Sequence, residues 1–462
     1  GPMLELNMVA CVNHGEQCTY RNHCRECYKA LSEHLGNLSC HLHRYSWMHN
    51  FKVNGVLLSG SIKQIPSTWK SRYLSMSIDE LNALPKGNVD MVPEDLHAFI
   101  HSSINVCLPY RQYKECTAKD ITTIALGKHM TPKKAHEVEK MSSMVAELCN
   151  KYNCSRVIDL GAGLGYVDRI LDQRHGIKVL AIEKDSSHIK ASSDKKFLQN
   201  IDILQLSLED NSECWSTLTS KVSEFCRFED AGVIGLHCCG DLSVYMMKLF
   251  NLMGCLKFML CASCCYHKMH YNIDGFDNFP LSQSLEDVCK QYSNNFLNVY
   301  SLRLGCQETP ARWFVQSELD HLYHQRCMKW GCLIEWLKDK GGVELSRHYK
   351  KLKGLNSSSN IEEFIEIFPK FYEVKCDSGA VLSDDKVRLL LQNAYRENRD
   401  SLDYLELMTV LQVIIQPVIE SLIMLDRAMY LLETNDSFVE VKVIPLFDEL
   451  ISPRNLGLLA VR

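Results

Sequence analysis

The sequence has no excess of positive charge, no internal repeat and no low-complexity tract. Its formal net charge of −5 gives no global attraction to a polyanion, so any surface that binds nucleic acid would have to be local. A long uninterrupted apolar run is also missing. The most apolar stretch, residues 407–425, contains Gln412, Gln416, Pro417 and Glu420, so we expect a buried, kinked helix and no membrane span.

A recognisable secretory signal is absent as well, although the 462 residues include 22 cysteines. Cysteine-rich chains without such a signal are typical of reducing compartments, where thiols act as small core residues, metal ligands or catalytic groups. We therefore expect a cytoplasmic or nuclear protein. The length and the hydrophobic content of 46% are enough for two or three domains with sizeable cores.

A glycine-rich loop follows the short apolar run at residues 156–160. It contains Gly161, Gly163 and Gly165 and leads into helical spacing at residues 166–173. The order strand, tight turn, helix is typical of a nucleotide-binding α/β unit. Glycines in such a turn allow positive φ angles and a close approach of ligand to backbone, so we expect a ligand over Gly161, Ala162, Gly163 and Gly165.

Two carboxylates accompany this loop. Glu183 ends a second apolar run, at residues 178–182, where such folds place the carboxylate that binds ribose hydroxyls. Asp159 lies just before the glycines, well placed to bind the ammonium of an amino-acid cofactor and poorly placed beside a pyrophosphate. A dinucleotide site would also have its third glycine one residue later. The pattern favours S-adenosylmethionine (SAM); the alternative is a glycine turn in an ordinary α/β domain.

Further strands are expected along the chain. The parallel strands are predicted at residues 156–160, 178–182, 203–206, 231–237 and 256–260, and a closing antiparallel pair at residues 439–444 and 456–461. A methyltransferase sheet ends in such a hairpin, with its seventh strand between the fifth and sixth. The predicted fold is therefore an α/β, Rossmann-like class I methyltransferase sheet of order 3-2-1-4-5-7-6.

We divide the chain into four consecutive segments on this basis. They are an N-terminal helical region (1–120), a SAM-binding core (121–265), a mainly helical insertion between the fifth and sixth strands (266–437) and the closing hairpin (438–462). Helices in the insertion are expected at residues 330–338, 361–367, 383–396 and 401–433.

Several separate blocks of sequence occur in one order that resembles a known family. They are residues 65–69, 133–138, the glycine loop, and residues 236–243, 263–266, 279–282, 420–427 and 452–456. Together they resemble the methyltransferase-like protein 25 family, whose shorter members are labelled "ribosomal RNA adenine dimethylase domain-containing". The resemblance implies a class I methyltransferase that converts SAM to S-adenosylhomocysteine. The family label carries little information about the substrate, because a shared fold does not imply a shared reaction.

The catalytic motif of class I methyltransferases follows the fourth strand, where this chain has His237 to Asp241. The Asn/Asp-Pro-Pro-aromatic loop of adenine N6 enzymes is missing, which disfavours adenine dimethylation. His237 is a candidate general base for a hydroxyl, ring nitrogen or imidazole, or a histidine that packs against the cofactor. Asp241 is a second catalytic candidate, although it is simpler as the N-cap of a helix at residues 242–250.

Cys264, Cys265, Tyr266 and His267 follow the fifth strand and are expected over the same cleft. A cysteine there could attack cytosine C6 during C5 methylation, but the usual Pro-Cys or Thr-Cys loop is missing, and buried inert thiols are the alternative. Tyr266 and His267 could contact a base or a peptide side chain, or only line the pocket. A tRNA 2′-O-methyltransferase family has similar motifs after both strands, which favours RNA.

Further cofactor contacts are expected from Lys134, His136 and Asp210. Lys134 or His136 could pair with the carboxylate of the cofactor and be oriented by Glu137; the alternative is a set of solvated helix charges. Asp210, with Glu209 as a competitor, is the expected partner of the adenine amino group.

An N-terminal cluster of Cys and His residues, at positions 11–43, suggests zinc through Cys24 and Cys27. Its second half, around Cys40, has poor spacing for a zinc site, so we expect a helical core and no metal.

RNA, either rRNA or tRNA, is the favoured substrate. The alternatives are a ribosomal or translation-related protein, and a scaffold that has lost catalysis; a partner protein could present the substrate. A basic strip at residues 128–140 beside the cleft would favour RNA, whereas an acidic or apolar cleft would favour the other two.

Overall fold

The computed structural model describes residues 18–108, 130–193, 200–292 and 296–462, which form two compact units. The first unit takes its described residues from 1–44, 105–311 and 416–462, and the second comprises 45–104 and 312–415. The four consecutive segments expected from the sequence cross these boundaries, because the N-terminal region and the insertion each contribute to both units.

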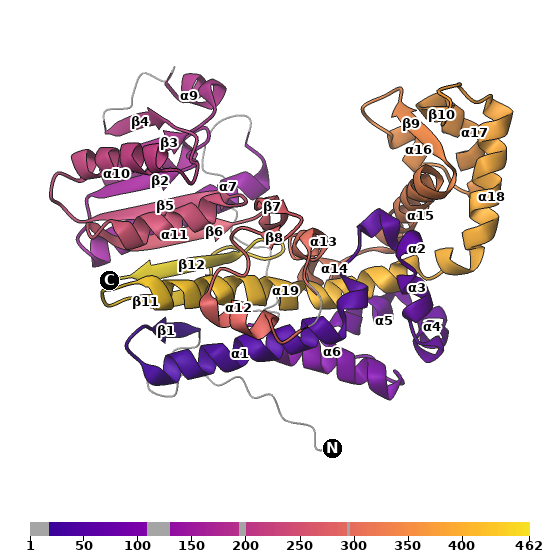
Figure 1. The fold of residues 1–462 in the computed structure, drawn as a ribbon, viewed down its shortest axis with the longest axis horizontal. Helices are drawn as coiled ribbons and strands as arrows, with labels where there is room; N and C mark the ends of the chain where they lie inside the picture. The colour runs from indigo at the N-terminus through magenta and orange to yellow at the C-terminus, as the bar shows by residue number, and fades with distance from the viewer. Residues whose placement is uncertain (1–17, 109–129, 194–199, 293–295) are drawn as a thin grey trace. The chain divides into compact units, whose positions relative to one another are not determined.

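The first unit is built on an eight-stranded sheet (Figure 1). Its strands are β1 (Thr19–Arg21), β2 (Arg156–Leu160), β3 (Lys178–Glu183), β4 (Ile201–Gln205), β5 (Ala231–Cys238), β6 (Leu256–Ser263), β11 (Glu440–Pro445) and β12 (Leu456–Val461). Their order is β4-β3-β2-β5-β6-β12-β11-β1. The strands β2 to β6 are parallel, and β12 is antiparallel to both β6 and β11. With β2 counted as the first strand, the order is 3-2-1-4-5-7-6, and the predicted fold is confirmed.

The sheet has one strand more than predicted. β1 pairs antiparallel with β11, with Tyr20 opposite Val441. Three residues are too few to show a period-two pattern, so the sequence did not reveal this strand.

Helices connect the strands of the first unit. They are α1 (Arg25–Arg44), α7 (Pro132–Lys151), α8 (Tyr166–His175), α9 (Ser186–Ser193), α10 (Ser212–Cys226), α11 (Leu242–Leu252), η5 (Tyr266–Lys268), α12 (Gln283–Cys289) and α13 (Val299–Leu304), with a small hairpin of β7 (Tyr271–Asn272) and β8 (Gly275–Phe276). Cys27 and His41 lie on the buried face of α1, in the described part of the N-terminal cluster. Cys11 and His14 lie outside the described residues.

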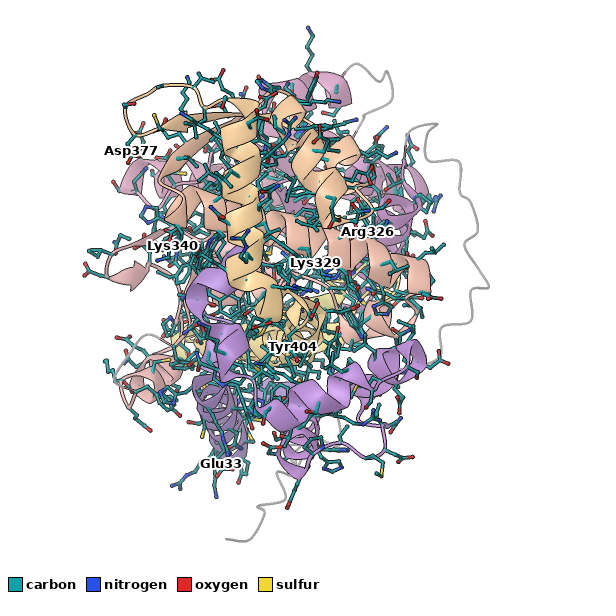
Figure 2. The ribbon with its side chains drawn as sticks, turned by 90° about the vertical axis from the view of Figure 1, so that its right-hand side faces the viewer. Glu33, Arg326, Lys329, Lys340, Asp377 and Tyr404 are labelled. Carbon is teal, nitrogen blue, oxygen red and sulfur yellow. The ribbon has the colours of Figure 1, made fainter. Side chains whose placement is uncertain are left out.

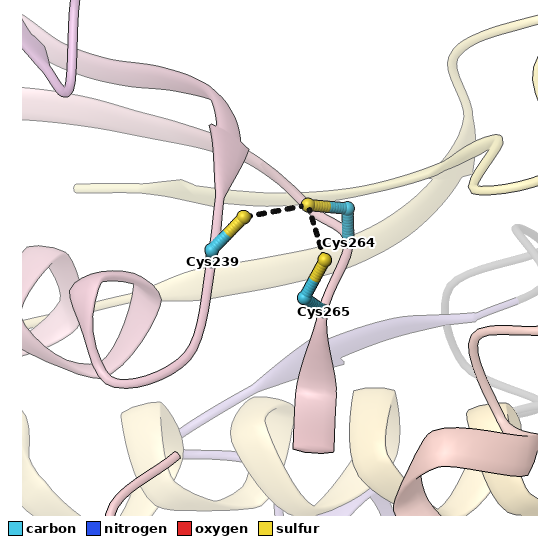
Figure 3. Close-up of side chains that lie close together, drawn as sticks. All are labelled: Cys239, Cys264 and Cys265. Atoms are coloured by element: carbon cyan, nitrogen blue, oxygen red, sulfur yellow. Dashed lines mark hydrogen bonds between the residues drawn. The ribbon is translucent and has the colours of Figure 1, made fainter. Parts of the chain in front are cut away.

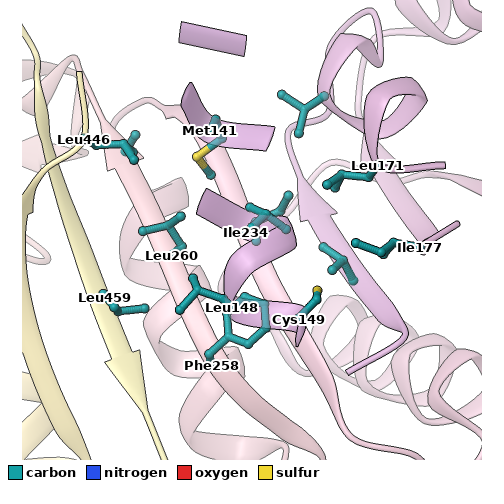
Figure 4. Packing of buried hydrophobic residues seen from close by; sticks show 14 of the residues in the cluster. Met141, Leu148, Cys149, Leu171, Ile177, Ile234, Phe258, Leu260, Leu446 and Leu459 are labelled. Atoms are coloured by element: carbon teal, nitrogen blue, oxygen red, sulfur yellow. The ribbon is translucent and has the colours of Figure 1, made fainter. Parts of the chain in front are cut away.

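A hydrophobic core lies between the sheet and the helices α7 and α8 (Figure 4). Leu148 of α7 and Leu171 of α8 meet Ile234 and Phe258 of the central strands there. The strands are apolar on both faces because helices cover a parallel sheet on both sides. A Cβ at Gly232 would lie 2.2 Å from the Phe258 ring, so this position must be glycine for the ring to fit.

α19 (Leu405–Thr434) contains the most apolar stretch of the chain. It is the described helix that is long and apolar enough to cross a membrane, but 94% of its most apolar window is buried inside the protein. Within the first unit, the Gln416 side chain donates to the Gly305 carbonyl at 2.8 Å and to Glu420 at 2.8 Å. The side-chain nitrogen of Gln416 and the Glu420 carboxylate are therefore paired inside the protein, whereas Gln416 Oε1 is buried without a hydrogen-bond partner among the described residues.

The second unit is mainly helical. Its elements are η1 (Ser46–Met48), η2 (Val53–Gly55), α2 (Val56–Ser59), α3 (Ser61–Gln64), α4 (Ser67–Leu74), α5 (Ile78–Ala83), η3 (Leu84–Lys86), α6 (Glu94–Val106), α14 (Pro310–Phe314), α15 (Glu318–Lys340), α16 (Lys353–Asn356), α17 (Ile361–Phe371) and α18 (Asp384–Leu402), with an antiparallel pair, β9 (Val343–Arg347) and β10 (Tyr372–Cys376). The ends of α6, α14 and α19 extend across the unit boundary.

A buried polar cluster joins the two segments of the second unit. His321 of α15 bonds to Asn82 at 2.6 Å and to Glu406. Beside it, Lys329 and Glu406 border a cavity of about 300 Å³, close to the position of Tyr404 (Figure 2). These contacts explain why residues 45–104 and 312–415 form one compact body although they are far apart in the sequence.

Candidate active site

A cleft of about 630 Å³ lies at the carboxyl ends of the parallel strands in the first unit. One side is lined by α7 (Lys134, Val138), by the glycine loop and α8 (Asp159, Gly161–Leu164, Tyr166, Val167), and by the end of β3 (Ile182–Lys184) with His188. The rest of the lining comes from residues 206–208, from the end of β5 (Leu236, His237), and from the residues after it (Cys239, Asp241, Leu242, Tyr245) with Lys268. Open α/β sheets bind their ligands at this edge, where the strand order reverses.

The glycine loop has the conformation that the sequence predicted. Gly161, Gly163 and Gly165 have φ angles of 74°, 59° and 69°. A Cβ on Gly161 would lie 2.9 Å from Leu242 Cδ2, so a larger residue would be both strained and crowded. Gly161, Ala162 and Gly163 line the cleft. Ala162, Gly163 and Gly165 also line a small hollow beside it.

Glu183 ends β3, is buried, and borders the cleft as expected. Its carboxylate accepts the Gly163 N–H at 2.7 Å and the Asp185 N–H at 2.9 Å. The strand end thereby holds the glycine loop in place. Its position fits a ribose-binding role, which stays a prediction.

Two buried carboxyl groups lie together on the opposite side of the loop. Burial raises the pKa of Asp159 to about 6, and burial together with the Asp159 charge raises the pKa of Asp168 well above its usual range. Asp168 is in the first turn of α8 and was not predicted as a site residue, because an acidic residue is ordinary at a helix start. The pair provides negative charge that a bound cation would stabilise.

His237 projects from the end of β5 in an unusual backbone conformation. Its φ angle is 61°, in the left-handed region, and the pairing of β5 with β6 is irregular between Leu236 and Cys238. For a residue other than glycine this conformation costs about 1–2 kcal/mol, so it has to be held by the surrounding structure.

Glu137 of α7 holds the imidazole of His237. The distance from His237 Nε2 to Glu137 Oε2 is 2.7 Å, and the Ser452 hydroxyl donates to Glu137 Oε1 at 2.6 Å. Burial acts to raise the pKa of Glu137, but these hydrogen bonds outweigh burial and lower it. A carboxylate accepts hydrogen bonds, so Nε2 carries the proton and Nδ1 is the acceptor nitrogen of neutral His237.

The predicted role of Glu137 toward its neighbours on α7 is therefore wrong. The side chain does not orient Lys134 or His136 but bonds to His237. His136 Nε2 accepts the Asp448 N–H at 2.9 Å, and the residue is not part of the cleft lining. Lys134 does border the cleft, as expected.

Asp241 borders the cleft but does not cap α11. It occupies the N-cap position with helical φ and ψ angles and makes no side-chain cap bond. Its carboxylate instead accepts the His270 N–H and the Asn278 side-chain amide, both at 2.8 Å. A capping side chain requires an extended backbone, which Asp241 lacks, so the predicted cap is wrong.

The residues after β6 are divided between the cleft edge and the core. Cys264 Sγ lies 3.0 Å from Cys239 Sγ and 3.5 Å from Cys265 Sγ, and of these three Cys239 lines the cleft (Figure 3). Tyr266 is buried, and its hydroxyl donates to Glu420 at 3.1 Å. His267 is half-buried and is not among the lining residues. Tyr266 therefore cannot stack on a substrate in this conformation.

Asp210 also differs from its expected placement. Its carboxylate accepts Trp215 Nε1 at 2.7 Å and pairs with Lys248 at 2.8 Å, and it does not line the cleft. The nearby wall is formed by residues 206–208. Trp215 on α10 and Lys248 on α11 determine the direction of the Asp210 side chain, which a local sequence pattern cannot predict.

A family model described as a methyltransferase domain matches residues 133–272, which contain the glycine loop, Glu183 and His237. The chain therefore contains a methyltransferase domain, and its sheet has the class I strand order. It is similar to two curated relatives, each named "Probable methyltransferase-like protein 25". The mouse protein is 25% identical over 62% of this chain and 47% of its own length, and the human protein 26% identical over 51% of this chain and 37% of its own length. The chain thus spans less than half the length of these relatives, and the predicted family resemblance is confirmed.

Two solved structures are also similar to this chain. The plantazolicin methyltransferase BamL, crystallised with a triazolic substrate analogue and S-adenosylhomocysteine, has a TM-score of 0.22 and 11% identity over 70% of this chain and 91% of its own. The plantazolicin methyltransferase BpumL with S-adenosylhomocysteine has a TM-score of 0.21 and 8% identity over 66% of this chain and 96% of its own. These TM-scores are too low to add to the sheet order described above.

The cofactor of such a domain is SAM, and the donor set of the cleft fits it. Asp159, with Asp168 behind it, offers a carboxylate to the ammonium group, and Glu183 offers one to the ribose hydroxyls. The glycine loop leaves room for the ligand because Gly161, Gly163 and Gly165 carry no Cβ. SAM is thus the cofactor that the sequence predicted, whereas its contacts in the cleft stay predictions.

Proposed function

We propose that this methyltransferase transfers the methyl group of SAM to a nucleophilic atom of RNA, with His237 as the general base. The observation that carries this proposal is the pair of Glu137 and His237 at the edge of the cleft, joined at 2.7 Å. Burial of a carboxylate is costly unless hydrogen bonds offset it, and the two oxygens of Glu137 are bonded to His237 and Ser452. The carboxylate is thereby placed to orient the imidazole.

The two residues have different parts in the reaction. When bound, SAM would supply an activated methyl group to the acceptor atom and would leave as S-adenosylhomocysteine. His237 Nδ1 accepts the proton that the acceptor hydroxyl or N–H loses as its bond to the methyl carbon forms. Glu137 is a positioning residue that holds the imidazole and stabilises the imidazolium. The backbone of His237, in the left-handed region, contributes to the direction of the ring.

The charges around the cleft favour RNA as the acceptor. Asp159 and Glu183 are buried and face the cofactor position, and Asp241 is engaged by His270 and Asn278. The exposed charged side chains that remain in the lining are basic: Lys184 and Lys268, with half-buried Lys134 nearby. A local basic rim on a chain of net charge −5 is the kind of surface that binds a phosphate backbone. Lys133 and Lys140 of the expected basic strip are exposed on α7, and Lys128 lies outside the described residues.

The test is methyl transfer from radiolabelled SAM to total RNA and to total protein, each taken from cells that lack this protein. We expect label in RNA. His237→Asn, which tolerates the left-handed backbone, should reduce kcat by about 10²- to 10⁴-fold. Glu137→Gln should reduce kcat and leave KM nearly unchanged, because it alters the positioning of His237 and not binding.

Binding of S-adenosylhomocysteine by the same variants is the control. Unchanged affinity would show that both variants keep the cofactor site. Label in protein alone would contradict the RNA proposal. Cofactor binding without transfer to either fraction would contradict catalysis by the isolated chain.

A further inference from the structure

Three thiols from two strand ends converge beside the cleft (Figure 3). Cys239 follows β5, whereas Cys264 and Cys265 follow β6, and their sulfur atoms all lie within 4.8 Å of one another. The sulfurs point toward a common centre, and all three residues are half-buried. Among the described residues, these three cysteines are the side chains of Cys, His, Asp or Glu that form a group close enough together to hold a metal ion.

The three sulfurs are close enough together to be ligands of one ion. Two of the separations are 3.0 and 3.5 Å, and small side-chain movements would bring them to about 3.8 Å, the separation of thiolates on tetrahedral zinc with bonds of about 2.3 Å. A disulfide would use two of the three sulfurs and leave the third without a partner. Packing does not require the cluster either, since neighbouring Cys238 and Cys261 are fully buried in the sheet whereas these three are not.

The backbone around the thiols is tightly built. The Cys265 carbonyl accepts the Gly240 N–H at 3.2 Å and the Lys268 N–H at 3.1 Å. Gly240 has a φ angle of 57°, and a Cβ there would lie 2.6 Å from the Lys268 carbonyl oxygen. The two loops that carry the thiols are thus held at close approach by a position that only glycine fits. Such preorganisation is what a metal site of fixed geometry needs.

We propose that Cys239, Cys264 and Cys265 bind one Zn²⁺ ion as three thiolates. Cys239 lines the cleft, so the fourth coordination position faces it and takes a water molecule. Three thiolates and Zn²⁺ carry a net charge of −1, which Lys268 in the same lining offsets. The ion joins the end of β5 to the end of β6 next to His237. This inference concerns metal binding alone and does not depend on methyl transfer.

Zinc content of the full chain is the direct test. The protein is prepared with a non-thiol reductant, dialysed against metal-free buffer, and measured by plasma mass spectrometry. We expect about one zinc per chain, and a loss of most of it in Cys239→Ser and in Cys264→Ser. Cys289→Ser, also half-buried but outside the cluster, is the matched control and should keep its zinc. Zinc retained by both cluster variants, or absent from the wild type after incubation with Zn²⁺, would overturn the proposal.

Cobalt substitution in the wild type separates metal loss from misfolding of a variant. Co²⁺ in a tetrahedral site with thiolates gives an intense sulfur-to-cobalt band and strong visible bands, whereas octahedral Co²⁺ is nearly colourless. The tetrahedral spectrum in the wild type and in Cys289→Ser, and its absence in folded Cys264→Ser, is the expected result. A weak octahedral spectrum in the wild type would contradict the thiolate site.

Discussion

At the scale of one residue, the buried carboxyl group of Asp159 is the part of the cleft that is best suited to bind a cation. This group is buried against Asp168, and burial raises its pKa to about 6. The protein therefore keeps a carboxylate in an environment that disfavours the charge, and a bound ammonium group would relieve this cost. Binding of the cofactor and ionisation of Asp159 should be linked.

The pH dependence of cofactor affinity follows from this linkage. The ammonium binds the ionised carboxylate, so affinity is full above pH 6 and is lost as the pH falls through about 6. When the pH falls from 7.5 to 5.5 we expect the Kd of S-adenosylhomocysteine to rise by up to about fourfold. Calorimetric titration at both pH values measures the change. Asp159→Asn should bind weakly at both, and an equally large pH effect in that variant would assign it to another group.

At the scale of elements, a single side chain fastens the β7–β8 hairpin to the start of α11. Asp241 accepts the His270 N–H and the Asn278 amide, both at 2.8 Å. The hairpin has two residues in each strand, too few to be stable alone. Its position over the first turn of α11 therefore depends on these hydrogen bonds.

Asp241→Ala should loosen this hairpin. We expect a loss of about 1–3 kcal/mol in the free energy of unfolding and faster hydrogen exchange at residues 270–278. Asp241→Asn keeps one acceptor oxygen and should fall between the wild type and Asp241→Ala. Urea denaturation and exchange mass spectrometry test both. Unchanged exchange in the hairpin of Asp241→Ala would show that other contacts hold it.

At the scale of the whole molecule, a net charge of −5 means that attraction to RNA has to come from a local surface. Lys184 and Lys268 are exposed in the lining of the cleft and would supply such a surface for the proposed RNA substrate. Each phosphate contact contributes about −0.7 to the slope of log affinity against log salt concentration for a single strand.

The double variant Lys184→Ala and Lys268→Ala should bind RNA more weakly and with a slope about 1 to 1.5 smaller in magnitude. Fluorescence anisotropy with a labelled single-stranded RNA over a range of salt concentrations gives both values. The double variant Lys151→Ala and Lys221→Ala, on α7 and α10 and outside the cleft lining, is the control of equal charge. The same loss in that control would assign RNA binding to overall charge and not to the cleft.

The strand positions and the glycine loop could be predicted because short-range patterns determine them, whereas the sheet order was predicted from the closing hairpin that methyltransferase sheets share. Buried parallel strands are continuous apolar runs, and a turn that needs positive φ angles needs glycine at Gly161, Gly163 and Gly165. Glu183 was found for the same reason, since its role follows from its place at the end of a strand.

Tertiary structure alone decided which side chains meet. Glu137 and His237 are 100 residues apart, and only the packing of α7 against the sheet brings them together. Tertiary packing also places Asp210 beside Lys248 and buries Tyr266 against Glu420. In the same way it brings together three thiols from two strand ends. Local sequence determines backbone conformation, whereas the direction and partners of a side chain depend on elements that are distant in the sequence.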